Sequence, residues 1–263
     1  MTFALPVVAV TVLSGLYTSA WGAFKDGPWE GFSRRTFPRS VLFSLAILGL
    51  LWAAPWLRGG VGALDLFQVF FLVMGIERLV TEIYKACFRA PRDPSRFFIP
   101  QQLTWFGRDV RRKAVRVVVG VLGCAGLGAV VSLPFEVRSL PAFLAVGFGA
   151  GLFVSCGGAY KDAPFEGFQP LKFLRSSLVL SAVSPLLWLL GPTPLGLLLF
   201  VNGGVERLLV EYYKSFVLRS VPGKFRPDLE IVSGRFLHWR HRLHHLALGI
   251  IVVVAATYLE HWR

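Results

Sequence analysis

Residues 75–85 read Gly-Ile-Glu-Arg-Leu-Val-Thr-Glu-Ile-Tyr-Lys, which places four charged side chains in a segment that is otherwise mostly apolar. Residues 204–214 read Gly-Val-Glu-Arg-Leu-Leu-Val-Glu-Tyr-Tyr-Lys, with Glu, Arg, Leu, Glu, Tyr and Lys at the same spacing. A second matching pair lies upstream, at residues 22–32 and 158–168. Both of these stretches read Gly-Ala-aromatic-Lys-Asp-x-Pro-aromatic-Glu-Gly-Phe, and Phe, Arg and Ser follow each of them. The two pairs indicate a tandem duplication.

The composition is that of a membrane protein. Of the 263 residues, 54% are apolar and 16% are charged, and the mean hydropathy is +0.59, whereas charged residues make up about 25% of soluble domains. The net charge of +13 would suggest nucleic acid as the partner of a soluble protein, but here the positions of the charges argue against it. Three single cysteines without a CxxC pattern indicate neither a disulfide framework nor a zinc site: Cys87, Cys124 and Cys156.

Eight apolar segments approach or exceed the ~20 residues that cross a ~30 Å hydrocarbon core. They are residues 3–23, 40–57, 63–86, 114–133, 140–159, 175–191, 194–215 and 243–260. The first lacks the basic start of a signal peptide, so we expect a retained span. Four spans per repeat give both repeats the same orientation, with a pseudo-twofold axis along the membrane normal. The predicted fold is an all-α polytopic membrane protein of two parallel four-helix repeats, residues 1–135 and 136–263.

Basic residues gather on one side of this predicted topology. That side holds the connections 24–39, 87–113, 160–174 and 216–242, and the other side holds both termini and three short turns. Only three of the 28 Lys and Arg residues fall on the terminal side: Arg58, Arg138 and Arg263. The bias predicts an inner-membrane protein with cytoplasmic connections and both termini outside. The two longest connections mix basic and aromatic residues, which favours segments at the inner interface, in contact with anionic lipids.

The charged motif is predicted to lie deep in the bilayer. Glu77 follows Asp65 by 12 residues, and Glu206 follows Pro194 by 12 residues. At ~1.5 Å per residue each glutamate lies about 18 Å from the outer surface, just past the midplane. A charge near the bilayer centre costs about 2.5–3.5 kcal/mol on insertion scales, so these charges are expected to be paired.

The pairing can be predicted in part from helix geometry. Arg78 and Glu82 are four residues apart on one helix face, so we expect them to pair with each other. Glu77 then needs a cation from elsewhere, and the candidates are Lys25, Arg39 or their counterparts in the other repeat. Small residues precede the charges in both copies: Gly75, Gly203 and Gly204. They predict either a close approach of another backbone or a local unwinding of the helix.

The upstream motif combines turn residues with polar residues that a turn does not need. Asp26 and Asp162 each precede a proline by two residues, which predicts a turn or a helix start. Gly31 and Gly167 can adopt the positive φ that turns the chain back. Together with the deep charges, the remaining polar residues form the candidate ligand-binding set: Lys25, Glu30, Arg39, Glu77, Arg78, Glu82, Lys85, Lys161, Glu166, Arg175, Glu206, Arg207, Glu211 and Lys214.

These charges have two interpretations: an ion-pair seam that locks the repeats together, or a cytosol-facing vestibule in each repeat. Three function classes follow from them. The first is a small transporter or flippase for an anionic solute or lipid head group. The second is a lipid-modifying phospho- or nucleotidyltransferase. The third is an assembly subunit with protein partners in the membrane.

Few signals point to an enzyme. The Lys and Glu-Gly-Phe of the upstream motif resemble a short signature of integral membrane cytidylyltransferases and polyprenol kinases, but the metal- and nucleotide-binding stretches of those enzymes are missing. No Walker, GxSxG or HExxH motif occurs, so no catalytic residue, metal or cofactor is assigned. Four histidines precede or begin the last span, where they form part of a basic rim or, alternatively, a metal or pigment site: His238, His241, His244 and His245.

Overall fold

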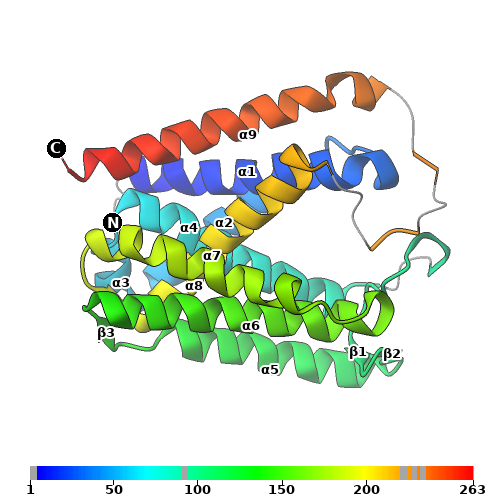
Figure 1. Ribbon diagram of the computed structural model, residues 1–263, viewed down its shortest axis with the longest axis horizontal. Helices are drawn as coiled ribbons and strands as arrows, with labels where there is room; N and C mark the ends of the chain where they lie inside the picture. Colours follow the sequence, from blue (N-terminus) through cyan, green and yellow to red (C-terminus); the bar gives the residue numbers. More distant parts are fainter. Residues whose placement is uncertain (1–4, 91–93, 220–223, 227–229, 232–234, 263) are drawn as a thin grey trace.

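Nine α-helices make up most of the residues that the computed structural model describes, which are 5–90, 94–219, 224–226, 230–231 and 235–262 (Figure 1). The helices are α1 (Leu5–Glu30), α2 (Arg39–Ala53), α3 (Pro55–Gly62), α4 (Leu66–Ile83), α5 (Lys113–Val131), α6 (Leu140–Glu166), α7 (Pro170–Leu189), α8 (Leu195–Tyr212) and α9 (Arg235–Glu260). Five-residue π-helical turns continue α4 and α8, at Tyr84–Phe88 and Tyr213–Val217.

Short antiparallel pairs connect the helices at both ends of the bundle. Strands β1 (Thr104–Trp105) and β2 (Arg108–Asp109) pair within one long connection, which also contains the 3₁₀ turn Pro94–Arg96. Strand β3 (Glu136–Val137), just before α6, pairs with β4 (Thr193–Pro194), just before α8.

The two charged helices begin where the depth argument placed them. The Asp65 side chain accepts a hydrogen bond from the Phe67 backbone N–H at 3.0 Å, and Gln68 accepts one from the Asp65 backbone N–H at 3.0 Å. This capping box fixes the start of α4. Helix α8 begins directly after Pro194. Glu77 and Glu206 therefore occupy matching positions, 12 residues after the residue that precedes each helix.

The prediction of a turn or helix start at Asp26 is wrong. Helix α1 continues to Glu30, so Asp26 and Pro28 lie in its last turns. Pro28 cannot donate to the Phe24 carbonyl four residues earlier, and the Arg240 side chain supplies that hydrogen bond instead, at 2.7 Å. Helix α6 likewise continues through Pro164 to Glu166. The predicted chain reversal at glycine is confirmed, because Gly31 and Gly167 have φ angles of 80° and 78°.

Several helices are long and apolar enough to cross a membrane. By length and composition, α1, α5, α6, α7 and residues 236–260 of α9 qualify, and α2 with α3 qualifies as one span bent by 111°. Helices α4 and α8 have 18 residues each, with three charged residues apiece. Large apolar side chains are exposed on the outer helices, as contact with lipid requires; examples are Leu122, Phe153, Leu178 and Val252. The chain is an all-α protein with the features of a multi-pass membrane protein.

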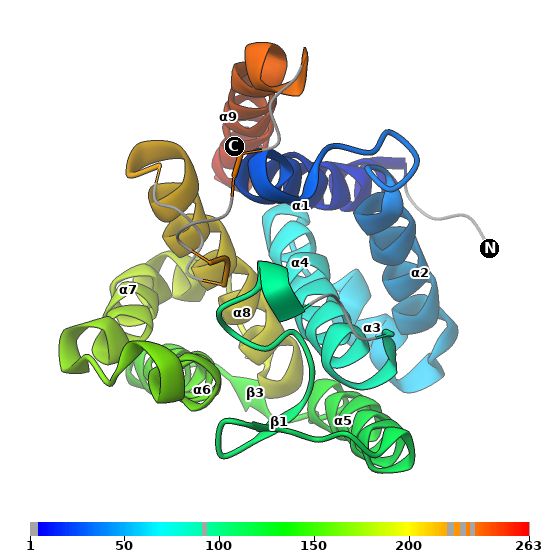
Figure 2. The ribbon, with the colours of Figure 1, turned by 90° about the vertical axis from the view of Figure 1, so that its right-hand side faces the viewer.

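Helices α4 and α8 lie at the centre of the bundle, with α1 and α2 beside α4 and with α6 and α7 beside α8 (Figure 2). Their backbones touch at two glycines. A Cβ atom on Gly75 would lie 2.0 Å from the Phe200 carbonyl oxygen, and one on Gly204 would lie 2.0 Å from that of Phe71. Both helices are continuous there, so the close approach is confirmed and the unwinding is not seen.

The outermost helices are α5 and α9. Helix α9 packs on α1 and α4, whereas α5 packs on α8 and on the π-helical turn after α4. The start of α1 and the end of α9 lie at the same end of the bundle, and β1 and β2 lie at the other end (Figure 1). Residues 1–4 and 263, and residues 91–93, 220–223, 227–229 and 232–234 of the long connections, fall outside the described part of the chain.

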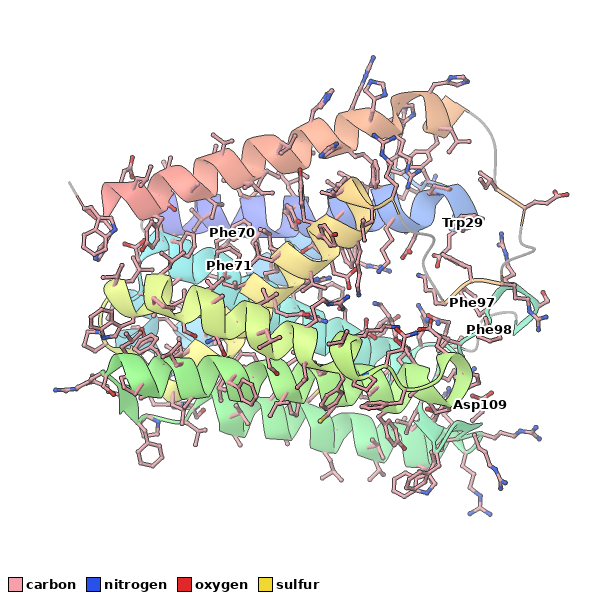
Figure 3. The ribbon with its side chains drawn as sticks, in the orientation of Figure 1. Trp29, Phe70, Phe71, Phe97, Phe98 and Asp109 are labelled. Atoms are coloured by element: carbon pink, nitrogen blue, oxygen red, sulfur yellow. The ribbon has the colours of Figure 1, made fainter. Side chains whose placement is uncertain are left out.

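The two long connections meet at the end of the bundle where β1 and β2 lie. Phe97 and Phe225 form an isolated antiparallel bridge, and their rings stack with centroids 5.5 Å apart. Trp29, from the last turn of α1, lies 5.9 Å from the Phe225 ring. Figure 3 shows Trp29, Phe97 and Phe98 gathered at this end, whereas Phe70 and Phe71 lie among the helices. Aromatic contacts therefore tie the connections to α1.

Candidate functional site

Two crosswise ion pairs join α4 to α8 at the centre of the bundle. Glu77 binds Arg207, and Glu206 binds Arg78. Both glutamates are buried, with 2% of each residue exposed. Glu77 does find its cation outside its own helix, but the predicted candidates are wrong: the cation is Arg207, the counterpart of Arg78, while Lys25 pairs with Glu211.

A serine completes each of these ion pairs. The Ser40 hydroxyl, at the start of α2, donates to Glu77 Oε1 at 3.0 Å, and Arg207 takes the other carboxylate oxygen, Oε2. The Ser176 hydroxyl of α7 donates to Glu206 Oε1 at 2.7 Å, while Arg78 takes Oε2. Matching atoms therefore make matching contacts in the two copies of the motif.

A second set of ion pairs lies one turn or more further along the two helices, toward their C-terminal ends. Glu82 accepts from Lys85 at 2.8 Å and lies 3.6 Å from Lys161 of α6. Glu211 lies 3.1 Å from Lys25 of α1 and 3.6 Å from Lys214. Each glutamate therefore contacts a lysine of its own helix and one from the upstream motif of the other half.

The predicted Arg78–Glu82 pair within α4 is wrong. Arg78 turns to Glu206 on α8, while Glu82 binds Lys85 and Lys161. The close approach at Gly75 and Gly204 explains the difference, because it brings a fully buried carboxylate of α8 within reach of Arg78. Attraction between charges is stronger away from water, so the buried partner is preferred to the exposed one.

The carboxylates of the upstream motif have different partners in the two halves. In the first half, the ammonium group of Lys224 lies 2.7 Å from Asp26 and 3.2 Å from Glu30. In the second half, Glu166 binds Lys172 at 2.6 Å. Asp162, the counterpart of Asp26, has no ion-pair or hydrogen-bond partner within the part of the chain that the structure describes.

A cavity of about 170 Å³ lies among α6, α7 and α8, with Arg78 of α4 at its wall. Its cationic lining residues are Arg78, Lys172, Arg175 and Lys214, and its acidic lining residues are Asp162, Glu206 and Glu211. Phe168 and Phe173 line it as well, with ring centroids 5.4 Å apart. The space is comparable to a cavity of ~150 Å³ that holds benzene, so it fits a small polar group.

Among the cations that line this cavity, Arg175 differs from the others because no described carboxylate is in contact with it. Arg78, Lys172 and Lys214 each have a carboxylate within 4 Å. Arg175 has no partner among the described residues, and its Nε atom is buried without a hydrogen bond. A half-buried guanidinium group whose buried Nε atom has no acceptor is suited to bind a carboxylate or phosphate. The counterpart Arg39 is exposed.

The corresponding space in the first half is filled by side chains of the chain itself. Trp21 occupies the position that matches Gly157, and its ring lies 4.6 Å from the Lys25 ammonium and 5.1 Å from the Arg207 guanidinium. Its indole N–H donates to Ser215 at 2.9 Å. Phe236 stacks on Phe32, the counterpart of Phe168, with centroids 5.2 Å apart. By contrast, a Cβ atom on Gly157 would meet nothing within 4 Å.

Sequence reasoning missed several residues that complete these contacts: Trp21, Ser40, Lys172, Ser176 and Lys224. The two serines follow Arg39 and Arg175 in both copies of the motif, so the repeat itself could have identified them. Lys224 could not be found in this way, because it lies outside the matched stretches. Its contacts depend on how the second long connection folds back onto α1.

The histidines contribute to packing. His244 stacks on Phe216 with centroids 4.7 Å apart, and its Nε2 lies 2.9 Å from the Tyr212 hydroxyl. The rings of His241 and His245 are 5.8 Å apart. No group of three or more His, Cys, Asp or Glu side chains among the described residues is placed to hold a metal ion. His244 is therefore a half-buried packing residue between α9 and the end of α8 with the turn that follows it.

Comparisons with protein-family models, with curated proteins and with solved structures give no match to this chain.

Proposed function

We propose that the chain is a small inner-membrane transporter or flippase that takes an anionic solute or lipid head group from the cytosolic side. In this proposal eight transmembrane helices form two parallel repeats, and α4 and α8 are the two spans that carry charges. The matched contacts of Glu77 and Glu206 support two equivalent units. The Lys/Arg bias supports cytosolic connections at the end where β1 and β2 lie.

The central ion pairs are assigned a structural role in this proposal. Glu77 and Arg207 neutralise each other in a nearly water-free position, which leaves no charge to attract a ligand. The seam instead holds the halves together and keeps Glu206 and Arg78 at the cavity wall. The two interpretations of the charges therefore apply to different residues: a seam at Glu77, and a binding site in the second half.

The observation that supports anion binding most strongly is the unpartnered Arg175 at the cavity wall. Arg175 is half-buried, and its buried Nε atom has no hydrogen bond, which costs about 1–3 kcal/mol. A ligand with a carboxylate or phosphate would remove that cost by pairing with the guanidinium group. Lys172 and Lys214 stand in the same wall and would add positive potential.

The test uses the purified protein in liposomes that contain fluorescent phosphatidylglycerol, with a membrane-impermeant quencher outside. We expect the wild type to accelerate lipid exchange between the leaflets and Arg175→Gln to abolish that acceleration. The matched control is Arg39→Gln, which removes the same side chain from the first half and should keep activity. Uptake of radiolabelled inorganic phosphate tests the soluble-anion form of the proposal. If wild-type rates equal those of protein-free liposomes in both assays, the proposed function is wrong.

A further inference from the structure

The cavity in the second half contains an unpartnered acid as well as an unpartnered base. Arg175 and Asp162 both line it, and among the described residues neither has a hydrogen bond or an ion pair within 4 Å. The other charged lining residues are engaged: Lys172 with Glu166, Lys214 with Glu211, and Arg78 with Glu206. A ligand that satisfies the whole cavity therefore needs a negative and a positive end.

The first half shows what the carboxylate of this motif binds. Asp26 is the counterpart of Asp162, and a primary ammonium group lies 2.7 Å from its Oδ2 atom. That ammonium belongs to Lys224, which comes from the second long connection. In the second half the matching carboxylate faces a cavity instead. The chain thus supplies its own amine to one copy of the motif and leaves the other copy open.

The first half also shows why one site per chain is expected. Trp21 stands where the second half has Gly157, and Phe236 covers Phe32. A Cβ atom on Gly27 would lie 2.5 Å from the Phe236 ring, whereas the matching Ala163 lines the cavity. Indole, phenyl and ammonium groups of the chain occupy the first copy, so among the described residues the space for a ligand lies in the second.

We infer that the cavity binds one zwitterionic aminophosphate group, with its phosphate on Arg175 and its primary ammonium on Asp162. This inference rests on the proposed function and narrows the anionic group that is bound to a phosphate whose ligand also carries a primary amine. The group is either the head group of an aminophospholipid or a soluble aminophosphate ester. A primary ammonium is favoured over a quaternary one because it can donate hydrogen bonds to the carboxylate, as Lys224 does to Asp26.

The experiment measures lipid binding to the full chain in detergent by native mass spectrometry. The probes are phosphatidylethanolamine, phosphatidylcholine and phosphatidylglycerol with identical acyl chains. We expect one phosphatidylethanolamine per chain, bound at least about tenfold more tightly than either other lipid, because a charge-assisted hydrogen bond contributes at least that factor. Competition with O-phosphoethanolamine separates the soluble ester from the lipid. If the ester displaces bound phosphatidylethanolamine, the head group alone suffices for binding. If it does not, the site requires the intact lipid.

Asp162→Asn should reduce the affinity for phosphatidylethanolamine to that for phosphatidylglycerol and leave the latter unchanged. The matched control, Asp26→Asn, should keep the preference, because Asp26 already binds Lys224. Gly158→Trp, at a residue that lines the cavity, should remove binding of all three lipids. If the wild type binds phosphatidylglycerol as tightly as phosphatidylethanolamine, or two lipids per chain, this inference fails while the proposed function stands. If no lipid and no phosphate binds, the proposed function fails with it.

Discussion

Removal of the Glu77 carboxylate charge should destabilise the folded protein more than the same change at its counterpart Glu206. In Glu77→Gln the amide oxygen can still accept from Ser40, so the variant removes mainly the charge. Arg207 then remains charged, with 8% of its side chain exposed. Its other described contacts are the Met74 carbonyl oxygen at 3.3 Å and the face of the Trp21 ring. Neither contact neutralises it.

The magnitude follows from burial. Loss of one partner from a buried ion pair costs about 3–5 kcal/mol, because the remaining charge is uncompensated. Glu206→Gln should cost less, since the remaining Arg78 has 24% of its side chain exposed and lies at the cavity wall. The exposed pair Arg138–Glu136, with 74% and 48% of its side chains accessible, provides the control. Glu136→Gln should change stability by less than about 1 kcal/mol.

The measurement is equilibrium unfolding in mixed micelles, followed by helix content as denaturing detergent is added. The double variant Glu77→Gln with Arg207→Gln should lose less free energy of unfolding than the sum of the single variants, by about 0.5–3 kcal/mol. A loss of less than about 1 kcal/mol in Glu77→Gln, or single losses that simply add, would show that Glu77 and Arg207 do not stabilise each other.

Three further predictions concern the seam and the topology. Gly75→Ala and Gly204→Ala should each cost about 1–3 kcal/mol or more, because the new methyl group meets a carbonyl oxygen of the facing helix. Gly203→Ala is the control in the same unfolding assay, since its methyl group would have nothing nearer than 3.9 Å; equal losses would contradict the packing. Ser176→Ala should cost about 1.5–3 kcal/mol through the lost hydrogen bond to Glu206, and Ser176→Thr should restore part of it. Two single-cysteine variants, made in a chain without its native cysteines, test the topology with a membrane-impermeant thiol reagent. Arg34→Cys should react only in inside-out vesicles, and Arg58→Cys only in intact cells. The opposite pattern would contradict the predicted topology.

The sequence allowed most of the helices and their charged centre to be predicted. The lengths of the apolar segments located the helices, and the duplication predicted matching roles for Glu77 and Glu206. The glycines before the charges predicted the close approach of two backbones, because only a residue without a side chain allows it. These features depend on residues close together in the sequence or on comparison of the two copies.

Contacts between distant segments could not be predicted in the same way. Arg78 pairs with a residue 128 positions away, whereas helix spacing considers only neighbours such as Glu82. Pro28 suggested a turn, but Arg240 satisfies the carbonyl group that the proline leaves without a donor. The cavity of the second half has a counterpart in the first half that side chains fill. This difference depends on Trp21 and Gly157, which lie one residue before the matched motifs.

An experimental structure of the chain in a lipid nanodisc that contains phosphatidylethanolamine would reveal both the central ion pairs and the occupant of the cavity. We expect Glu77 and Arg207 in contact at the centre, and density for one phosphate group against Arg175 in the second half. Trp21 should fill the matching space in the first half. A cavity without such density, with Arg175 turned onto a carboxylate of the chain, would contradict the account.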